Sequence, residues 1–209
     1  MKILALDSSS PVASVAFLSI NSGTTEILFE QNTHHARSDS SALFTGLESA
    51  VKVGGRPDAL CVGLGPGSYN GLRASIAAAR GFATALGLPL HAIPSPLAIA
   101  GSDSGFWTIG DARGGHYWVA RVAGESFAEE PLLLSPEDAV IHVSSRTLPV
   151  YSAAPLVGFD EIMIATPSAA RLAMLAQKND PSYVVSSTPE PLYLKPPHIT
   201  APKALTPTR

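Results

Sequence analysis

The residues of this chain with the clearest chemical potential gather in two short stretches, an acidic turn and a glycine-rich loop. Asp7 ends the first apolar run and is followed by three serines. Residues 65–73, with the sequence G-P-G-S-Y-N-G-L-R, join a second apolar run to an alanine-rich helix. A turn with three glycines leaves backbone N–H groups that could cradle an anion at the positive end of the helix. The same glycines could instead let another part of the backbone come close.

Known phosphate-binding patterns do not fit the glycine-rich loop. A Walker A loop needs Lys and then Ser or Thr after its last glycine, whereas Leu72 and Arg73 follow Gly71. The dinucleotide fingerprint fails as well, because its third glycine is absent. Phosphate binding through bare N–H groups remains open. In that case Asp7 would help to position a hydrated magnesium. The alternative is that Asp7 only forms the turn. The candidate nucleotide-binding residues are Asp7, Ser8, Ser9, Gly65, Gly67 and Ser68.

Other kinds of catalytic site find no support in the sequence. The adjacent His34 and His35 cannot share one face of a helix, and no histidine is followed by another four residues later. A nucleophile elbow, G-x-S-x-G, would need glycine where Asn70 stands. The sequence therefore predicts no catalytic residue and no metal ligand.

The composition of the chain limits the kinds of partner and the cellular compartment that we expect. The 209 residues suit one domain of two lobes or two small domains. Charged residues make up 15%, below the roughly 25% typical of soluble domains, which favours a surface that a partner or a second copy covers. The net charge of -3 gives no general attraction to nucleic acid. Because the single Cys61 is predicted to be buried in a strand, and the chain shows neither a signal peptide nor a long apolar run, we expect a cytoplasmic protein.

The first hundred residues predict one α/β layer. Three apolar runs, at residues 3–6, 13–18 and 25–30, indicate a meander of strands. A helix from Ser38 or Ser40 to Gly54, a strand at 58–64, a helix at 72–86 and a strand at 90–93 follow. This order is typical of a mixed sheet and resembles the ribonuclease-H-like lobe.

Both predicted helices carry small residues at helical spacing. Gly46 and Ala50 lie on the first, and Ala77, Gly81 and Ala85 are among those on the second. Small residues let helices approach closely, either inside the chain or against a partner. A glycine in the middle of a helix costs about 1 kcal/mol relative to alanine, so Gly81 needs a reason.

The second half gives weaker signals. Residues 107–110 and 117–122 indicate two strands around a turn, and residues from Ser135 and from Ser168 indicate two helices. Seven prolines from Pro181 onward indicate an extended arm. We therefore predict an N-terminal lobe at 1–96 and a shorter C-terminal lobe with a proline-rich arm at 97–209.

Several segments together resemble one family, the bacterial TsaB (YeaZ) proteins of threonylcarbamoyladenosine biosynthesis. Residues 4–9 and 14–16 match its opening strand, its D-T/S-S/A turn and its S-V-A segment. Residues 65–73 match its signature G-P-G-S-F-T-G-L-R except at two positions. Residues 111–118 resemble D-A-R-x-G-x-x-Y-W, one residue shorter, and residues 190–195 resemble E-P-V-Y-L-R.

The resemblance implies an actin-like ATPase fold of two ribonuclease-H-like lobes. It also implies a non-catalytic scaffold that pairs with a paralogue, TsaD, and with the ATPase TsaE. TsaD transfers threonylcarbamoyl to adenosine 37 of tRNAs that read codons beginning with A. The chain would contact tRNA only indirectly and would contact no membrane.

The resemblance also implies that the two helices of the first lobe form the interface with TsaD. Alone, the chain would form a homodimer through the same helices. Arg73, a cation in the first turn of a helix, suggests an acidic partner. The predicted interface residues are Ser40, Leu43, Leu47, Tyr69, Asn70, Leu72, Arg73, Ala77, Arg80 and Gly81.

An alternative function is a nucleotide-dependent ATPase or phosphotransferase of the same fold. It would use Asp7 and the glycine-rich loop, with ATP or ADP as the cofactor. A peptidase is disfavoured because the sequence offers no metal cluster and no nucleophile set. The favoured prediction is an accessory subunit with no required cofactor.

Overall fold

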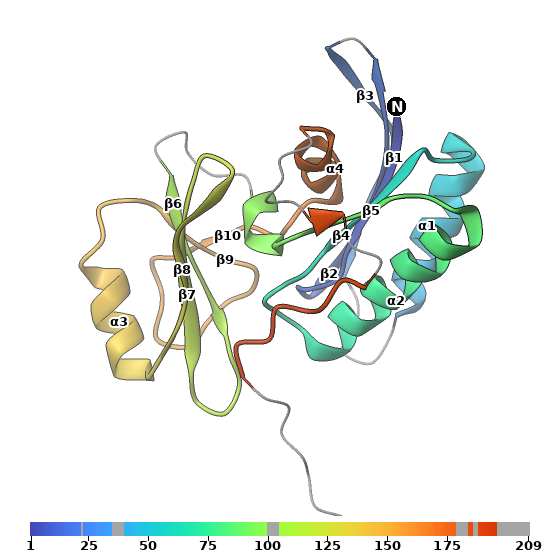
Figure 1. Ribbon diagram of the computed structural model, residues 1–209. Helices are drawn as coiled ribbons and strands as arrows, with labels where there is room; N and C mark the ends of the chain where they lie inside the picture. The colour runs from blue at the N-terminus through green and yellow to red at the C-terminus, as the bar shows by residue number, and fades with distance from the viewer. Residues whose placement is uncertain (22, 35–39, 100–104, 179–183, 186–187, 196–209) are drawn as a thin grey trace, which may run out of the picture.

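The protein is described by a computed structural model covering residues 1–21, 23–34, 40–99, 105–178, 184–185 and 188–195. Two mixed sheets stand side by side with helices on their faces (Figure 1). The first sheet has the strand order β11-β5-β4-β1-β2-β3, and the second has the order β10-β9-β6-β7-β8. The predicted α/β architecture of two lobes with mixed sheets is therefore confirmed.

The first sheet contains the meander that the sequence predicts, extended by three further strands. Its strands are β1 (Lys2–Asp7), β2 (Val12–Asn21), β3 (Thr24–His34), β4 (Ala59–Gly63), β5 (Leu90–Ile93) and β11 (Val184–Val185). β1 pairs antiparallel with β2 and parallel with β4, and β4 pairs parallel with β5. β1 thus lies at the centre of the lobe, and its carboxyl end brings Asp7 next to the end of β4.

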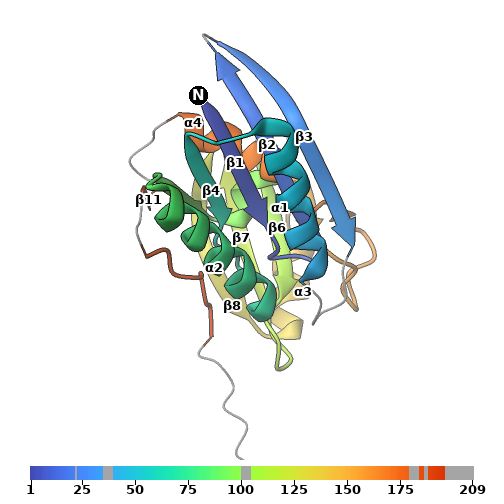
Figure 2. The same cartoon turned by 90° about the vertical axis from the view of Figure 1, so that its right-hand side faces the viewer.

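Helices cover both faces of the first sheet. On one face lie α1 (Ser41–Gly54) and α2 (Tyr69–Leu86), and on the other lies α4 (Ala169–Gln177), as Figure 2 shows. Because side chains alternate along a strand, Leu4 and Leu6 pack under α1 and α2, while Ile3 and Ala5 pack under α4. Burial on both faces explains why residues 3–6 of β1 are all apolar.

The lobes predicted at residues 1–96 and 97–209 are linked by segments of the chain that return to the first sheet. The chain does leave the first sheet near residue 96, but α4 and β11 return to it. The backbone N–H of Ala169 donates to Ser14 Oγ at 2.8 Å, and that of Ser168 donates to the Ala98 carbonyl at 3.1 Å. The first lobe therefore contains residues from both ends of the chain.

The second lobe is a smaller sheet with one helix on its outer face. Its strands are β6 (Phe106–Asp111), β7 (Tyr117–Ala123), β8 (Ser126–Leu134), β9 (Val150–Ser152) and β10 (Met163–Ile164). The helix α3 (Pro136–Ser144) packs on Trp107, Ile109 and Val119 through Ala139. Within the described residues, no helix combines the length and the apolar character that crossing a membrane requires.

Most predicted elements are present, with shifted ends. The hairpin of β6 and β7 and the helices after Ser135 and Ser168 are confirmed. α2 begins three residues earlier than predicted, because Ser68 Oγ accepts a hydrogen bond from the Gly71 N–H and caps the helix. Strands β8 to β11 were not predicted.

Candidate functional site

The glycine-rich loop is a tight corner between β4 and α2 that packs against the turn between β1 and β2. The Ser68 N–H donates to the Ser9 carbonyl, and Ser8 Oγ donates to the Gly71 carbonyl, both at 2.7 Å. A Cβ atom on Gly67 would lie 2.1 Å from the Ser9 carbonyl oxygen. One on Gly71 would lie 2.0 Å from that of Ser8. These glycines therefore permit the close approach of another backbone segment, which was the second interpretation of this loop.

Asp7 is enclosed behind this corner. Its side chain is fully buried, and Ser9 donates to Oδ1 through both its N–H, at 2.8 Å, and its hydroxyl, at 2.7 Å. Ser95 Oγ donates to Oδ2 at 2.5 Å and accepts from the Gly65 N–H at 2.8 Å. Burial raises the pKa of Asp7, against the hydrogen bonds from Ser95 and Ser9, which lower it. The carboxyl group therefore links the two turns of the corner.

The structure brings all six candidate nucleotide-binding residues together, but most of their polar groups bond within the protein. Both oxygens of Asp7 accept hydrogen bonds, and the hydroxyls of Ser8 and Ser9 donate to the Gly71 carbonyl and to Asp7. Across the part of the chain that the structure describes, no group of three or more His, Cys, Asp or Glu could hold a metal ion.

The predicted interface residues divide into two sets. Leu43, Leu47 and Leu72 belong to the core between the sheet and the helices, with exposures of 2% or less. We correct their assignment, because their side chains stabilise the fold and leave no surface for a partner. The exposed set is Ser40, Tyr69, Asn70, Arg73, Ala77, Arg80 and Gly81.

The outer face of α1 and α2 also carries an apolar groove that the sequence did not predict. It has a volume of about 670 Å³. Its lining consists of Val51, Gly55, Arg56, Pro57, Gly81, Phe82, Ala85 and Leu86. Phe44 and Val53 add exposed apolar surface on α1. The groove combines residues of both helices with Gly55, Arg56 and Pro57 of the loop after α1, and the helical period alone does not indicate such a groove.

Among the residues that the structure describes, nothing packs against the position where a side chain of residue 81 would begin. A Cβ atom at this position would meet nothing within 4 Å. This contrasts with Gly46, whose Cβ would lie 3.0 Å from a methyl carbon of Val15. The absence of a side chain at Gly81 therefore leaves open space in the groove.

The segment at residues 188–195 crosses the start of α2 and reaches the second lobe (Figure 1). Tyr193 stacks on Tyr69 with ring centroids 5.2 Å apart, and Arg73 donates to the Tyr69 hydroxyl at 2.9 Å. Lys195 Nζ donates to the Arg113 carbonyl at 3.0 Å. Arg73, for which the sequence suggested an acidic partner, thus contacts an aromatic ring.

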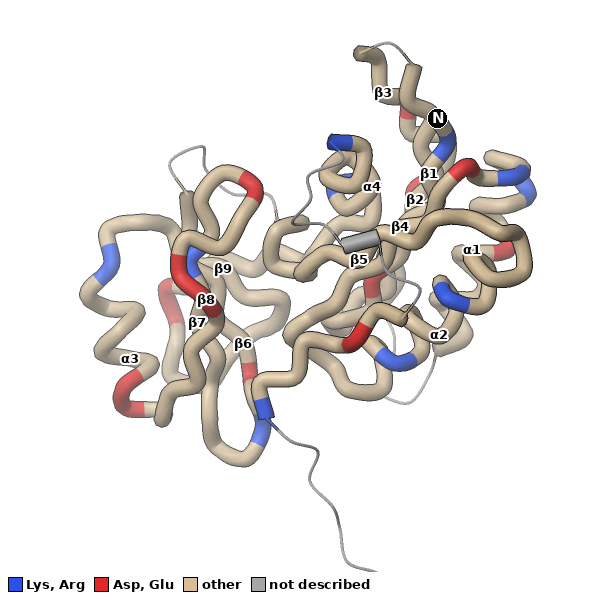
Figure 3. The backbone as a smooth tube through the Cα atoms, in the orientation of Figure 1, with Lys and Arg blue, Asp and Glu red and all other residues tan. Residues whose placement is uncertain are grey.

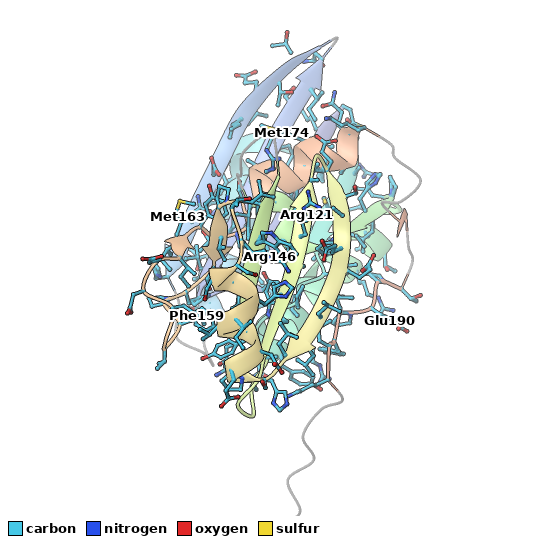
Figure 4. All side chains as sticks on the ribbon, turned by 90° about the vertical axis from the view of Figure 1, so that its left-hand side faces the viewer. Arg121, Arg146, Phe159, Met163, Met174 and Glu190 are labelled. Atoms are coloured by element: carbon cyan, nitrogen blue, oxygen red, sulfur yellow. The ribbon has the colours of Figure 1, made fainter. Side chains whose placement is uncertain are left out.

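A second polar cluster lies on the outer face of the second sheet (Figure 4). The Arg146 guanidinium lies 4.1 Å above the centre of the Trp107 ring, and His142 meets the same ring edge-on at 4.9 Å. Burial, with a smaller effect of Arg146, lowers the pKa of His142. Because His142 lies on α3 and Trp107 on β6, this cluster attaches the helix to the sheet.

Charged residues are scattered over both lobes rather than gathered on one surface (Figure 3). Glu48 and Lys52 form an ion pair one helical turn apart on α1, at 2.7 Å and largely exposed. Such surface pairs contribute little to stability.

Comparison with known proteins connects the chain to a set of uncharacterised and YeaZ-like proteins. A family model described as "TsaD: tRNA N6-adenosine threonylcarbamoyltransferase" matches residues 32–120. An uncharacterised protein of Mycobacterium tuberculosis is 32% identical over 124 residues, a match that spans 57% of this chain and 58% of the relative. The match thus leaves more than a third of that relative unaligned.

Two solved structures from Pseudomonas aeruginosa share the fold. One, described as an uncharacterised protein with similarity to peptidase YeaZ, superposes with a TM-score of 0.72 at 21% identity, over 93% of this chain and 99% of its own. The other, described as YeaZ, superposes with a TM-score of 0.66 at 20% identity, over 85% and 92%. At these identities the likeness establishes the fold alone.

Proposed function

The chain resembles the TsaB (YeaZ) family in its motifs and its fold, and from this premise we propose that it is a non-catalytic scaffold subunit. Its partner would be a TsaD-type protein, with a TsaE-type ATPase as the third member. The assembly would attach threonylcarbamoyl to adenosine 37 of tRNAs that read codons beginning with A. The chain itself would contact tRNA only through its partners.

One observation carries this proposal: the exposed, small-residue face of α2 beside an apolar groove. Gly81 costs helix stability and fills no internal contact, so its absent side chain leaves room for something outside the chain. Ala77 lies one turn earlier, and Ala85 lines the groove one turn later. A partner helix could approach this stripe closely, and Phe82 and Val51 would supply apolar contact. The same face would support a homodimer when no partner is present.

The alternative, an ATPase or phosphotransferase, is less well supported by the geometry. Asp7 would have to give up hydrogen bonds from Ser9 and Ser95 to reach a hydrated magnesium. The backbone around Gly67 and Gly71 is filled by the neighbouring turn. Calorimetry of the isolated chain with ATP and magnesium separates the two functions. Tight binding that is lost in Asp7→Ala would favour the enzyme, provided that this variant stays folded.

We expect Ala77→Glu and Gly81→Trp to abolish pairing with the TsaD-type protein of the same genome. A buried unpaired charge or a bulky ring on the stripe should weaken the complex by roughly a hundredfold or more. Isothermal titration calorimetry and light scattering after gel filtration measure the affinity and the stoichiometry.

The matched control for this experiment is Thr147→Glu, which changes an exposed residue of the second lobe. All three variants should keep the circular dichroism of the unmodified chain. The proposal fails if the unmodified chain forms no heterodimer at about 50 μM, far above the dissociation constants of specific complexes. It also fails at this surface if the stripe variants bind as well as the control.

A further inference from the structure

We propose that the outer face of α2 receives an amphipathic helix of the partner, with carboxylates along one side and apolar side chains along the other. This inference rests on the proposed scaffold function and names the chemistry of the surface that would meet α2. Its evidence is the order in which an apolar groove, the small-residue stripe and a row of arginines lie across this helix.

The three rows follow from the position of each residue on the helix. Successive residues of an α-helix are turned by about 100°, so Ala77 and Gly81 follow one line along the exposed side of α2. Phe82 lies on the side toward α1, where it lines the groove. Arg73 and Arg80 lie on the opposite side of the stripe, and both are exposed. The stripe therefore has an apolar flank and a cationic flank.

Neither arginine forms an ion pair with another described residue, since the pairs in this part of the chain involve other cations. Arg73 donates one N–H to the Tyr69 hydroxyl, and a guanidinium has five. α2 contains no Asp or Glu. The single carboxylate of α1, Glu48, already pairs with Lys52 at 2.7 Å. Both guanidinium groups are therefore available to a carboxylate from outside the chain.

The spacing of the two arginines sets the pattern of the partner. Arg73 and Arg80 are seven residues apart, which is two turns or about 10.5 Å along a helix. A second helix laid along the stripe at a small crossing angle would meet them with acidic residues at a similar spacing. Its apolar residues would lie on the adjoining side and enter the groove beside Phe82. A partner without carboxylates would desolvate the arginines and give them no counter-charge.

The same arrangement makes the face a weaker match for a second copy of this chain. A two-fold dimer joins identical patches, so α2 would meet arginines and, on α1 and α2, no unpaired carboxylate. Salt screens the attraction between opposite charges and the repulsion between like charges. Raising the salt concentration should therefore weaken the heterodimer but not a homodimer formed through this face.

Charge reversal tests the cationic flank. We expect Arg73→Glu and Arg80→Glu each to weaken binding of the TsaD-type protein of the same genome at least about tenfold. Lys178→Glu makes the same change in net charge at the end of α4, on the other face of the sheet, and should leave the affinity unchanged. Titration calorimetry at about 50 and 300 mM salt measures these affinities, and circular dichroism checks that each variant is folded.

Arg80→Lys provides a direct readout of the group that meets this position. It keeps the charge and should bind nearly as well as the unmodified chain. A carbodiimide joins a lysine amine to a carboxylate that touches it, with no spacer between them. Treatment of the Arg80→Lys complex, followed by mass spectrometry, should show a crosslink from position 80 to an Asp or Glu on a helix of the partner.

The outcomes separate this inference from the scaffold function. If the heterodimer depends on the stripe but both arginine reversals bind as well as Lys178→Glu, the acidic helix is excluded while the scaffold function is retained. A complex that forms without any crosslink from Arg80→Lys also overturns the acidic helix. If the unmodified chain forms no heterodimer at about 50 μM, both proposals fail.

Discussion

Gly71→Ala is expected to destabilise the protein by at least about 3 kcal/mol. The new Cβ would lie 2.0 Å from the carbonyl oxygen of Ser8, far inside van der Waals contact. The Cβ would be fixed to the first turn of α2 and the carbonyl belongs to the backbone of the β1–β2 turn, so neither can rotate away as the end of a long side chain could. A shift of either turn would also disrupt the hydrogen bond from Ser8 Oγ to the Gly71 carbonyl. Urea unfolding followed by circular dichroism measures the loss.

Gly81→Ala is the matched control, with the opposite expected sign. A methyl group there meets nothing within 4 Å, and alanine favours a helix over glycine by about 0.5–1 kcal/mol. The unfolding midpoint should therefore rise in Gly81→Ala and fall sharply in Gly71→Ala. Similar effects of the two substitutions would contradict the assignment of Gly71 to a backbone contact and of Gly81 to open space.

The second large effect concerns Asp7 and the pH dependence of stability. Burial raises the pKa of Asp7 above its ordinary value of 3.8. Between the unfolded and folded pKa values the folded state binds the extra proton, so the stability that Asp7 contributes is full below about pH 4 and is lost as the pH rises through the folded pKa. Stability should thus fall with rising pH at this site, the reverse of the usual salt-bridged carboxylate.

Asp7→Asn removes the titration and should remove this dependence. The difference in unfolding free energy between the unmodified chain and Asp7→Asn should decrease from about pH 4 to pH 7. The exposed Asp160→Asn serves as the control. A difference that rises with pH would show that the folded state stabilises the charged carboxylate instead.

Asp7→Ala should be more severe than Asp7→Asn at every pH. It leaves the Ser9 N–H and two serine hydroxyls without their acceptor inside the protein. Each buried group without a partner costs roughly 1–3 kcal/mol, so the total loss should reach at least about 3 kcal/mol. Urea midpoints of the two variants, measured side by side, check this order.

The corner at residues 65–73 could be predicted because its signals are local. Glycines in the turn, an apolar strand before it and a helix stop at Gly87 all lie within thirty residues of one another. Local patterns also predicted the buried Cys61, whose exposure is 0%. They left open what occupies the space beside the glycines, because the Ser8–Ser9 backbone comes from sixty residues earlier in the chain.

The division of the interface residues required the structure. Leucines at helical spacing identify a helix and its apolar face, but the sequence alone does not say whether that face meets a sheet or a partner. In this fold Leu43, Leu47 and Leu72 meet the sheet, whereas Ala77, Arg80 and Gly81 of α2 are exposed.

The return of α4 to the first sheet also determines when that lobe can form during synthesis. Ile3, Ala5 and Cys61 are made early, but the helix that covers them, with Leu172 and Leu175, is made more than a hundred residues later. Until then, the apolar face of the first sheet that α4 covers stays exposed on the growing chain. Such long-range closure slows folding and exposes a chain to aggregation. The ribosome must release most of this protein before its first lobe is complete.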